Sequence, residues 1–181
     1  PIRVAQLELA ASKLDSIFGQ FRPALESASR ALAIFEQLGD PMCIANAELC
    51  AGRALLFLHR IAEGETKLRA AMAVFREAVN QKTMGSALSA LGAAKIMEGD
   101  IAAARELLMS AGAIYKSMGA DGRLPAVLSL LAEAEFRGGD IEAALRVAGE
   151  ALEAHRRLRS GPNVINLLYN IAAYLSLIHI S

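Results

Sequence analysis

The sequence contains no tryptophan, few phenylalanines and tyrosines, and only two cysteines, and these scarcities limit the possible folds. β-Sheets favour aromatic and β-branched residues, whereas this chain is rich in alanine and leucine, so its composition favours closely packed helices. Five prolines and the lack of low-complexity runs argue against long disordered linkers. Cys43 and Cys50 would lie roughly 10 Å apart along one helix, too far for a disulfide, so we expect free thiols in a reducing compartment.

The chain has no excess of charge of either sign and no convincing membrane span. Nineteen Lys and Arg balance nineteen Asp and Glu, so net charge does not attract the chain to nucleic acid or to an anionic membrane. Residues 164–180 are apolar, but Asn166 and Asn170 interrupt them and seventeen residues are marginal for a span. We therefore expect a final packed helix there, in a cytoplasmic protein that binds neither nucleic acid nor membrane.

Motifs for catalysis, cofactors and metals are also missing. The sequence has no Gly-rich phosphate loop, no His-Glu-x-x-His and no Gly-x-Ser-x-Gly. No Cys and His cluster completes a metal site. We expect no enzyme, no cofactor and no metal. His59 and His155 are interpreted as structural substitutions, and Arg156, Arg157 and Arg159 as a solvated helix end.

The sequence does contain a repeat of forty residues, which is clearest at the junction 97–104. There Gly99 can end one helix in the left-handed conformation, and Asp100 can cap the next. Five columns agree at this spacing: Phe21, Ile61, Ile101 and Ile141; the small Ala24, Gly64, Ala104 and Ala144; Ala31, Ala71, Ala111 and Ala151; the rings Phe35, Phe75, Tyr115 and His155; and the turn residues Gly19, His59, Gly99 and Gly139.

Each repeat is predicted to hold two helices. Apolar residues at three- and four-residue spacing and the stop signals between them set the boundaries, as where Gly39, Asp40 and Pro41 end one helix and begin the next. First helices are predicted at Val4–Phe18, Met42–Leu58, Thr83–Met97, Arg123–Phe136 and Asn163–Leu177. Second helices are predicted at Phe21–Leu38, Ile61–Val79, Ile101–Met118 and Ile141–Leu158.

This spacing resembles the tetratricopeptide repeat. Residues at that repeat's signature offsets are Leu91, Gly92, Gly99, Ile101, Ala104, Leu108 and Ala111, then Ala132, Gly139, Ile141, Ala144, Ala148 and Ala151, and also Gly52, Ile61, Gly64, Leu68 and Ala71. The period is forty residues rather than about thirty-four, and Leu88, Leu128 and Leu168 replace the usual aromatic. Longer units of this kind resemble the helical regions of bacterial signal-transduction ATPases, transcriptional activators and cyclase-linked regulators.

The resemblance implies an all-α fold, an α-α superhelix of about four and a half stacked helix pairs. We expect residues 1–174 to form this helical repeat domain as part of a larger bacterial protein. Residues 175–181 are expected to be a non-native tail, because Leu175–Ser181 resembles a translated sequencing adapter. First helices would line the concave groove, with partner-binding residues Gln6, Lys13, Asn46, Arg53, Ser86, Ser89, Ser129, Glu133, Asn166 and Tyr169.

Such a groove favours a scaffold that binds a protein or peptide, in a larger regulatory protein of signal transduction. The alternatives are an effector-sensing domain that binds a small molecule and regulates an attached ATPase, cyclase or DNA-binding domain, and a structural spacer. We also expect self-association through an uncapped C-terminal edge. There Ile165, Leu168, Ile171 and Ala172 would pack backward, leaving Leu167, Tyr174 and Leu175 uncovered.

Overall fold

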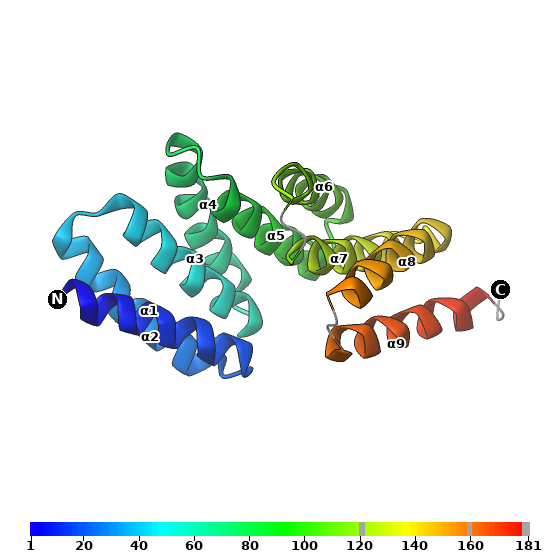
Figure 1. Cartoon of the computed structure of the whole chain (residues 1–181), viewed down its shortest axis with the longest axis horizontal. Helices are drawn as coiled ribbons and strands as arrows, with labels where there is room; N and C mark the ends of the chain where they lie inside the picture. The colour runs from blue at the N-terminus through cyan, green and yellow to red at the C-terminus, as the bar shows by residue number, and fades with distance from the viewer. Residues whose placement is uncertain (120–121, 159–160, 179–181) are drawn as a thin grey trace. The chain divides into compact units, whose positions relative to one another are not determined.

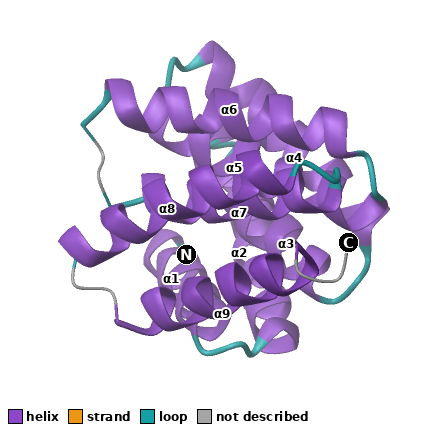
Figure 2. Cartoon of the chain, turned by 90° about the vertical axis from the view of Figure 1, so that its right-hand side faces the viewer, coloured by secondary structure: helices purple, strands orange, loops and turns teal. Residues whose placement is uncertain are grey.

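The computed structural model describes residues 1–119, 122–158 and 161–178, and within these ranges every regular element is a helix (Figures 1 and 2). No predicted helix end differs from the observed one by more than two positions, as with Val4 against Ile2. The helices are α1 (Ile2–Ile17), α2 (Phe21–Leu38), α3 (Pro41–Phe57), α4 (Ile61–Glu77), α5 (Gln81–Glu98), α6 (Ile101–Ser117), α7 (Leu124–Arg137), α8 (Ile141–Arg157) and α9 (Gly161–Ile178).

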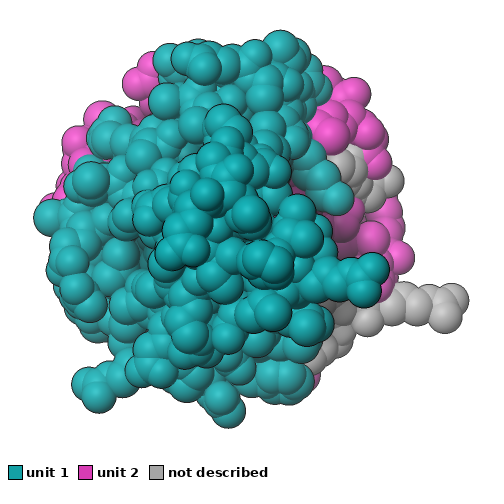
Figure 3. Space-filling model, turned by 90° about the vertical axis from the view of Figure 1, so that its left-hand side faces the viewer, with its two compact units in different colours: residues 1–90 teal, residues 91–181 magenta. Residues whose placement is uncertain are grey.

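The chain divides into two compact units, residues 1–90 and residues 91–181, with the boundary inside α5 (Figure 3). In the first unit α1 packs on α2, α2 on α3 and α3 on α4. In the second unit α6 packs on α7, α7 on α8 and α8 on α9. Each unit is therefore built from consecutive helices that pack on their neighbours in the sequence.

The turns repeat every twenty residues, half the period that the sequence shows most clearly. A left-handed backbone with positive φ occurs at Gly19, Gly39, His59, Val79, Gly99, Gly119 and Gly139. Each helix with its turn thus occupies one half-repeat. His59 stands in a column of left-handed glycines, which confirms its interpretation as a structural substitution.

At three of these turns, the residue after the left-handed position is an aspartate that caps the next helix. Asp40 accepts hydrogen bonds from the backbone N–H groups of Met42 and Cys43, both at 3.0 Å. Asp100 and Asp140 each accept one from the residue three positions on, at 3.2 and 2.9 Å. These carboxylates satisfy backbone donors that the first turn of a helix leaves unpaired. The predicted N-caps are confirmed.

Small residues let the helices approach closely. Ala104 and Ala144 are completely buried, as expected for the small-residue column. At Gly52 an added Cβ would lie 2.9 Å from Leu68 Cγ and 3.0 Å from the Gly64 carbonyl oxygen, so this crossing of α3 and α4 requires glycine. Alanine and larger apolar side chains complete the cores: Ala5, Ala31, Leu32, Phe35 and Ala47 in the first unit, and Ala132, Ala144, Val147, Ala148, Ala151, Leu167 and Tyr174 in the second.

The buried face of α9 differs from the prediction. Leu167 and Tyr174, predicted to be uncovered, are 2% and 4% exposed, and the Tyr174 ring stacks on Phe136 with centroids 4.2 Å apart. Ile165 and Leu168, predicted to pack backward, are 68% and 43% exposed. Leu167 and Tyr174 are seven positions apart, about two helical turns, so these two share the face that packs on α7 and α8.

The other expectations for α9 are mixed. Ile171 packs against the core as predicted, whereas Ala172 is exposed. Leu175 is 45% exposed, as expected. Among the side chains of α9 that the structure describes, the large apolar ones left accessible are therefore Ile165, Leu168, Tyr169 and Leu175. Self-association through this edge stays a prediction, now with a different set of contact residues. Among the described residues, no helix has both the length and the apolar character needed to cross a membrane.

Candidate functional site

The predicted groove residues all lie on first helices, which are α1, α3, α5, α7 and α9. Gln6, Lys13 and Arg53 are exposed, and Tyr169 is 78% exposed. The half-buried ones are Asn46, Ser86, Ser89, Ser129 and Glu133. The side chain of Asn166 lies outside the described part of the chain.

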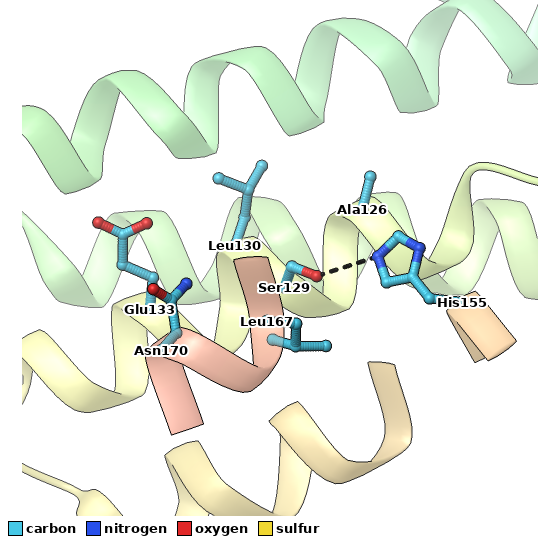
Figure 4. Close-up of a pocket in the computed structure, with 7 residues that line it drawn as sticks. All are labelled: Ala126, Ser129, Leu130, Glu133, His155, Leu167 and Asn170. Atoms are coloured by element: carbon cyan, nitrogen blue, oxygen red, sulfur yellow. Dashed lines mark hydrogen bonds between the residues drawn. The ribbon is translucent and has the colours of Figure 1, made fainter. Parts of the chain in front are cut away.

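A pocket of about 260 Å³ opens between α7, α8 and α9 in the second unit (Figure 4). Helix α7 supplies four residues at three- and four-residue spacing, which places them on one face of the helix. Helix α8 supplies one residue and α9 supplies two. The lining is Ala126, Ser129, Leu130, Glu133, His155, Leu167 and Asn170.

Ser129 and His155 form the first polar pair in the pocket. Ser129 Oγ donates to the Pro125 carbonyl oxygen at 3.0 Å and lies 3.4 Å from His155 Nε2. His155 is only 5% exposed, and burial lowers the pKa of its imidazole from the ordinary 6.5. The ring is therefore neutral at pH 7 and adds no positive charge to the pocket.

Glu133 and Asn170 form the second polar pair, which Figure 4 shows at the other end of the pocket from His155. Glu133 Oε1 forms an ion pair at 2.8 Å with Arg137 Nη2, one helical turn further along α7. The Glu133 side chain is 36% and that of Arg137 50% exposed. An ion pair this accessible contributes little to stability, so Glu133 can exchange Arg137 for another cation.

The pocket thus combines apolar walls with hydrogen-bond acceptors and one negative charge. Ala126, Leu130 and Leu167 supply the walls. None of the described side chains that line it is Lys or Arg. The described residues also contain no group of three or more His, Cys, Asp or Glu side chains placed to hold a metal ion. The arrangement is suited to binding a ligand.

The structure brings together only part of the predicted site. Ser129 and Glu133 line the pocket, whereas Tyr169 does not. His155 and Asn170 are pocket residues that the sequence analysis did not assign to binding. His155 is buried in the ring column, as Phe35, Phe75 and Tyr115 are, which confirms its structural role and adds a place in the pocket lining. The sequence does contain a signal that could have identified Asn170, because it is a polar residue within an otherwise apolar helix.

Comparison with known proteins identifies the fold. No protein-family model matches the sequence, and no curated protein matches it. Solved structures do match. Aspartyl phosphate phosphatase F from Bacillus subtilis superposes with a TM-score of 0.83 at 15% identity, over 97% of this chain and 46% of that protein. BtubC (BKLC) from P. vanneervenii gives a TM-score of 0.79 at 17% identity, over 97% of this chain and 74% of that one.

A third structure has repeats of the predicted kind. The TPR-like repeats of a kinesin light chain from Podosopora anserina superpose with a TM-score of 0.69 at 16% identity, covering 100% of this chain and 98% of that one. At identities this low the similarity establishes the fold and leaves activity open. It confirms the resemblance that the forty-residue columns indicated. The chain has the all-α fold of the tetratricopeptide-like helical repeat proteins.

Proposed function

We propose that this chain is a helical interaction scaffold that binds a protein or peptide partner through its first helices, which carry the predicted groove residues. The observation that supports this most directly is the pocket between α7, α8 and α9, which contains two of those residues, Ser129 and Glu133. Apolar walls with a few convergent polar groups are typical of recognition sites. We place the scaffold within a larger regulatory protein of the bacterial cytoplasm, with residues 1–174 as its repeat domain.

The exposed side chains on the first helices of each unit also favour a protein partner. Tyr169 is 78% exposed, and aromatic residues of this kind are enriched at protein interfaces. Lys13 and Arg53 on the first helices of the other unit are exposed cations available for polar contacts. The second unit therefore offers an aromatic anchor and the first unit offers charged groups, and both kinds of side chain suit contacts with a partner protein.

A second candidate function is effector sensing, and the same pocket favours it. A volume of about 260 Å³ is close to the lower end of small-molecule sites. A ligand that contacts α7, α8 and α9 together would stabilise the packing of these helices by binding the folded state. Such a ligand could regulate an attached domain.

The scaffold proposal is tested by site-specific photocrosslinking in the parent organism. A benzophenone amino acid replaces Tyr169 or Gln6 on first helices, and the matched control replaces the exposed Glu106 on the second helix α6. We expect one partner protein to be crosslinked from both first-helix positions and not from Glu106. Equal crosslinking from Glu106, or none from either first-helix position, would rule the proposal out.

A further inference from the structure

We infer that the pocket between α7, α8 and α9 binds a primary alkylammonium group, with the alkyl chain along Leu130 and Leu167 and the ammonium group at Glu133. This inference deepens the proposed function, because it names the ligand chemistry of that site. It rests on the shape and the charge of the pocket.

The charge of the lining selects a cation. Glu133 carries the one formal negative charge among the described lining residues, and no Lys or Arg is among them. His155 is neutral at pH 7, because burial lowers its pKa, so it does not repel a cation. An anionic ligand would meet the Glu133 carboxylate, whose basic partner Arg137 lies outside the lining and is half exposed to solvent.

The polar atoms also suit a donor-rich group. An ammonium group has three N–H donors and no acceptor, so it needs several oxygen acceptors around it. The Glu133 carboxylate supplies two oxygens and the Asn170 side-chain amide supplies another at the same end of the pocket (Figure 4).

The apolar walls suit an unbranched alkyl chain. Ala126, Leu130 and Leu167 are the apolar residues of the lining, and Figure 4 shows Leu130 and Leu167 between Glu133 and His155. A lysine stem of about four carbons can lie along these apolar side chains with the charged group at its end, as long cationic side chains do when they bury their stems. Arg137, which pairs with Glu133 at 2.8 Å, lies outside the lining. The ligand therefore displaces only a solvent-accessible partner.

Two sources could present this chemistry: a lysine side chain of a partner peptide, or a free aliphatic amine. The test uses Nα-acetyl-lysinamide and n-butylamine as probes, and Nα-acetyl-norleucinamide as the neutral control of similar shape. Each is titrated into the full chain, and the side-chain NMR signals of Asn170 and His155 are followed. We expect saturable shifts with both amines and at least tenfold weaker binding of the norleucine probe.

Substitutions assign the effect to this site. Glu133→Gln removes the charge and keeps the size of a half-exposed side chain, so the fold is retained and both amines should bind at least tenfold more weakly. Glu106→Gln removes an exposed carboxylate on α6, away from the pocket lining, and should leave binding unchanged. Ala126→Leu enlarges an apolar side chain of the lining and fills part of the pocket. It should weaken the binding of all probes, while the helical circular dichroism signal stays constant.

The probes and the variants together distinguish the two ligand sources and show which outcomes would contradict the inference. Tighter binding of Nα-acetyl-lysinamide than of n-butylamine assigns the site to a partner's lysine, and equal binding assigns it to a free amine. Equal binding of the norleucine and lysine probes, or unchanged amine binding by Glu133→Gln, would overturn the inference. Amine binding without any crosslinked partner would keep the inference and remove the scaffold proposal, so the two can fail independently.

Discussion

Gly92 on α5 lies directly against Leu108 on α6, so closely that a Cβ added to Gly92 would come within 2.6 Å of Leu108 Cγ. Both residues are completely or nearly completely buried, and Leu108 is 0% exposed. The contact explains why glycine stands inside a helix, where it is otherwise unfavourable by roughly 1 kcal/mol relative to alanine. The crossing of α5 and α6 depends on the missing side chain.

We therefore expect Gly92→Ala to destabilise the chain by about 1–3 kcal/mol through overpacking. Gly112→Ala is the matched control, because it also lies inside a helix but its Cβ would meet Leu124 and Val127 only at 3.9 Å. The control should be neutral or stabilising by up to roughly 1 kcal/mol, since alanine favours helix. Urea unfolding of both variants measures the difference, and equal midpoints would contradict a close crossing.

Much of this architecture could be predicted from the sequence. Equivalent positions of a repeat have the same structural environment, so the residue type that suits it recurs in each repeat. The column of Ala24, Gly64 and Ala104 is buried throughout, as its small size implies. The face of α9 could have been found in the same way. Leu167 stands forty residues after Val127, which is 2% exposed, and Tyr174 stands forty after the buried Ala134.

The error on α9 has a physical cause. The helix is apolar on several sides, so residue type alone does not distinguish its core face from its free face. The pocket was beyond prediction for a different reason: it depends on how α7, α8 and α9 are spaced. Asn170 and Glu133 come from helices separated by α8, and periodicity does not report distances between such side chains.

The left-handed turns predict a substitution that stabilises the chain, whereas Gly92→Ala is expected to destabilise it. Val79 has φ of 52° and is 77% exposed, in the position where Gly39, Gly99 and Gly139 stand in other half-repeats. A left-handed conformation costs an L-residue roughly 1–2 kcal/mol, and a β-branched residue is an outlier there. Val79→Gly should therefore stabilise the chain by about 1 kcal/mol, since the strain relieved exceeds the added flexibility of the unfolded chain.

Thermal unfolding measures this effect. Gly99→Val is the reciprocal variant at a φ of 83°, with open space around the new side chain, and it should lower the melting temperature. A lower melting temperature for Val79→Gly would show that the turn after α4 carries no strain.

The N-caps are tested by Asp100→Ala and Asp140→Ala. Each change removes a carboxylate that accepts from a first-turn N–H, so each should cost roughly 0.5–2 kcal/mol of unfolding free energy. Glu106→Gln, an exposed change within α6, should stay within about ±0.5 kcal/mol. If the two alanine variants unfold at the same urea concentration as the Glu106 variant, these caps contribute nothing.

His155 predicts a dependence of stability on pH. Burial lowers its pKa in the folded state below the ordinary 6.5, so the unfolded chain binds the proton more readily. Stability from this residue is complete above about pH 6.5 and falls as the pH drops through the folded-state pKa, because proton uptake then favours unfolding. His155→Phe, which restores the ring found at Phe75, removes this contribution.

The measurement is the free energy of unfolding between pH 8 and pH 5, roughly the range in which imidazole titrates. The natural chain should lose more stability toward pH 5 than His155→Phe. Parallel curves for the natural chain and His155→Phe would contradict a buried neutral imidazole.

The buried face of α9 gives the sharpest comparison, because two tyrosines on one helix have opposite environments. Tyr174 is 4% exposed and stacks on Phe136, whereas Tyr169 is 78% exposed. Tyr174→Ala should cost about 3–5 kcal/mol, as removal of a buried aromatic ring does, and Tyr169→Ala should stay within about ±0.5 kcal/mol. Deleting Leu175–Ser181 should leave most of the stability, because Leu175 is exposed and Tyr174, which anchors the helix, is kept. Denaturant melts of the three variants decide between the faces: equal losses for the two tyrosines would mean that α9 does not dock through Leu167 and Tyr174.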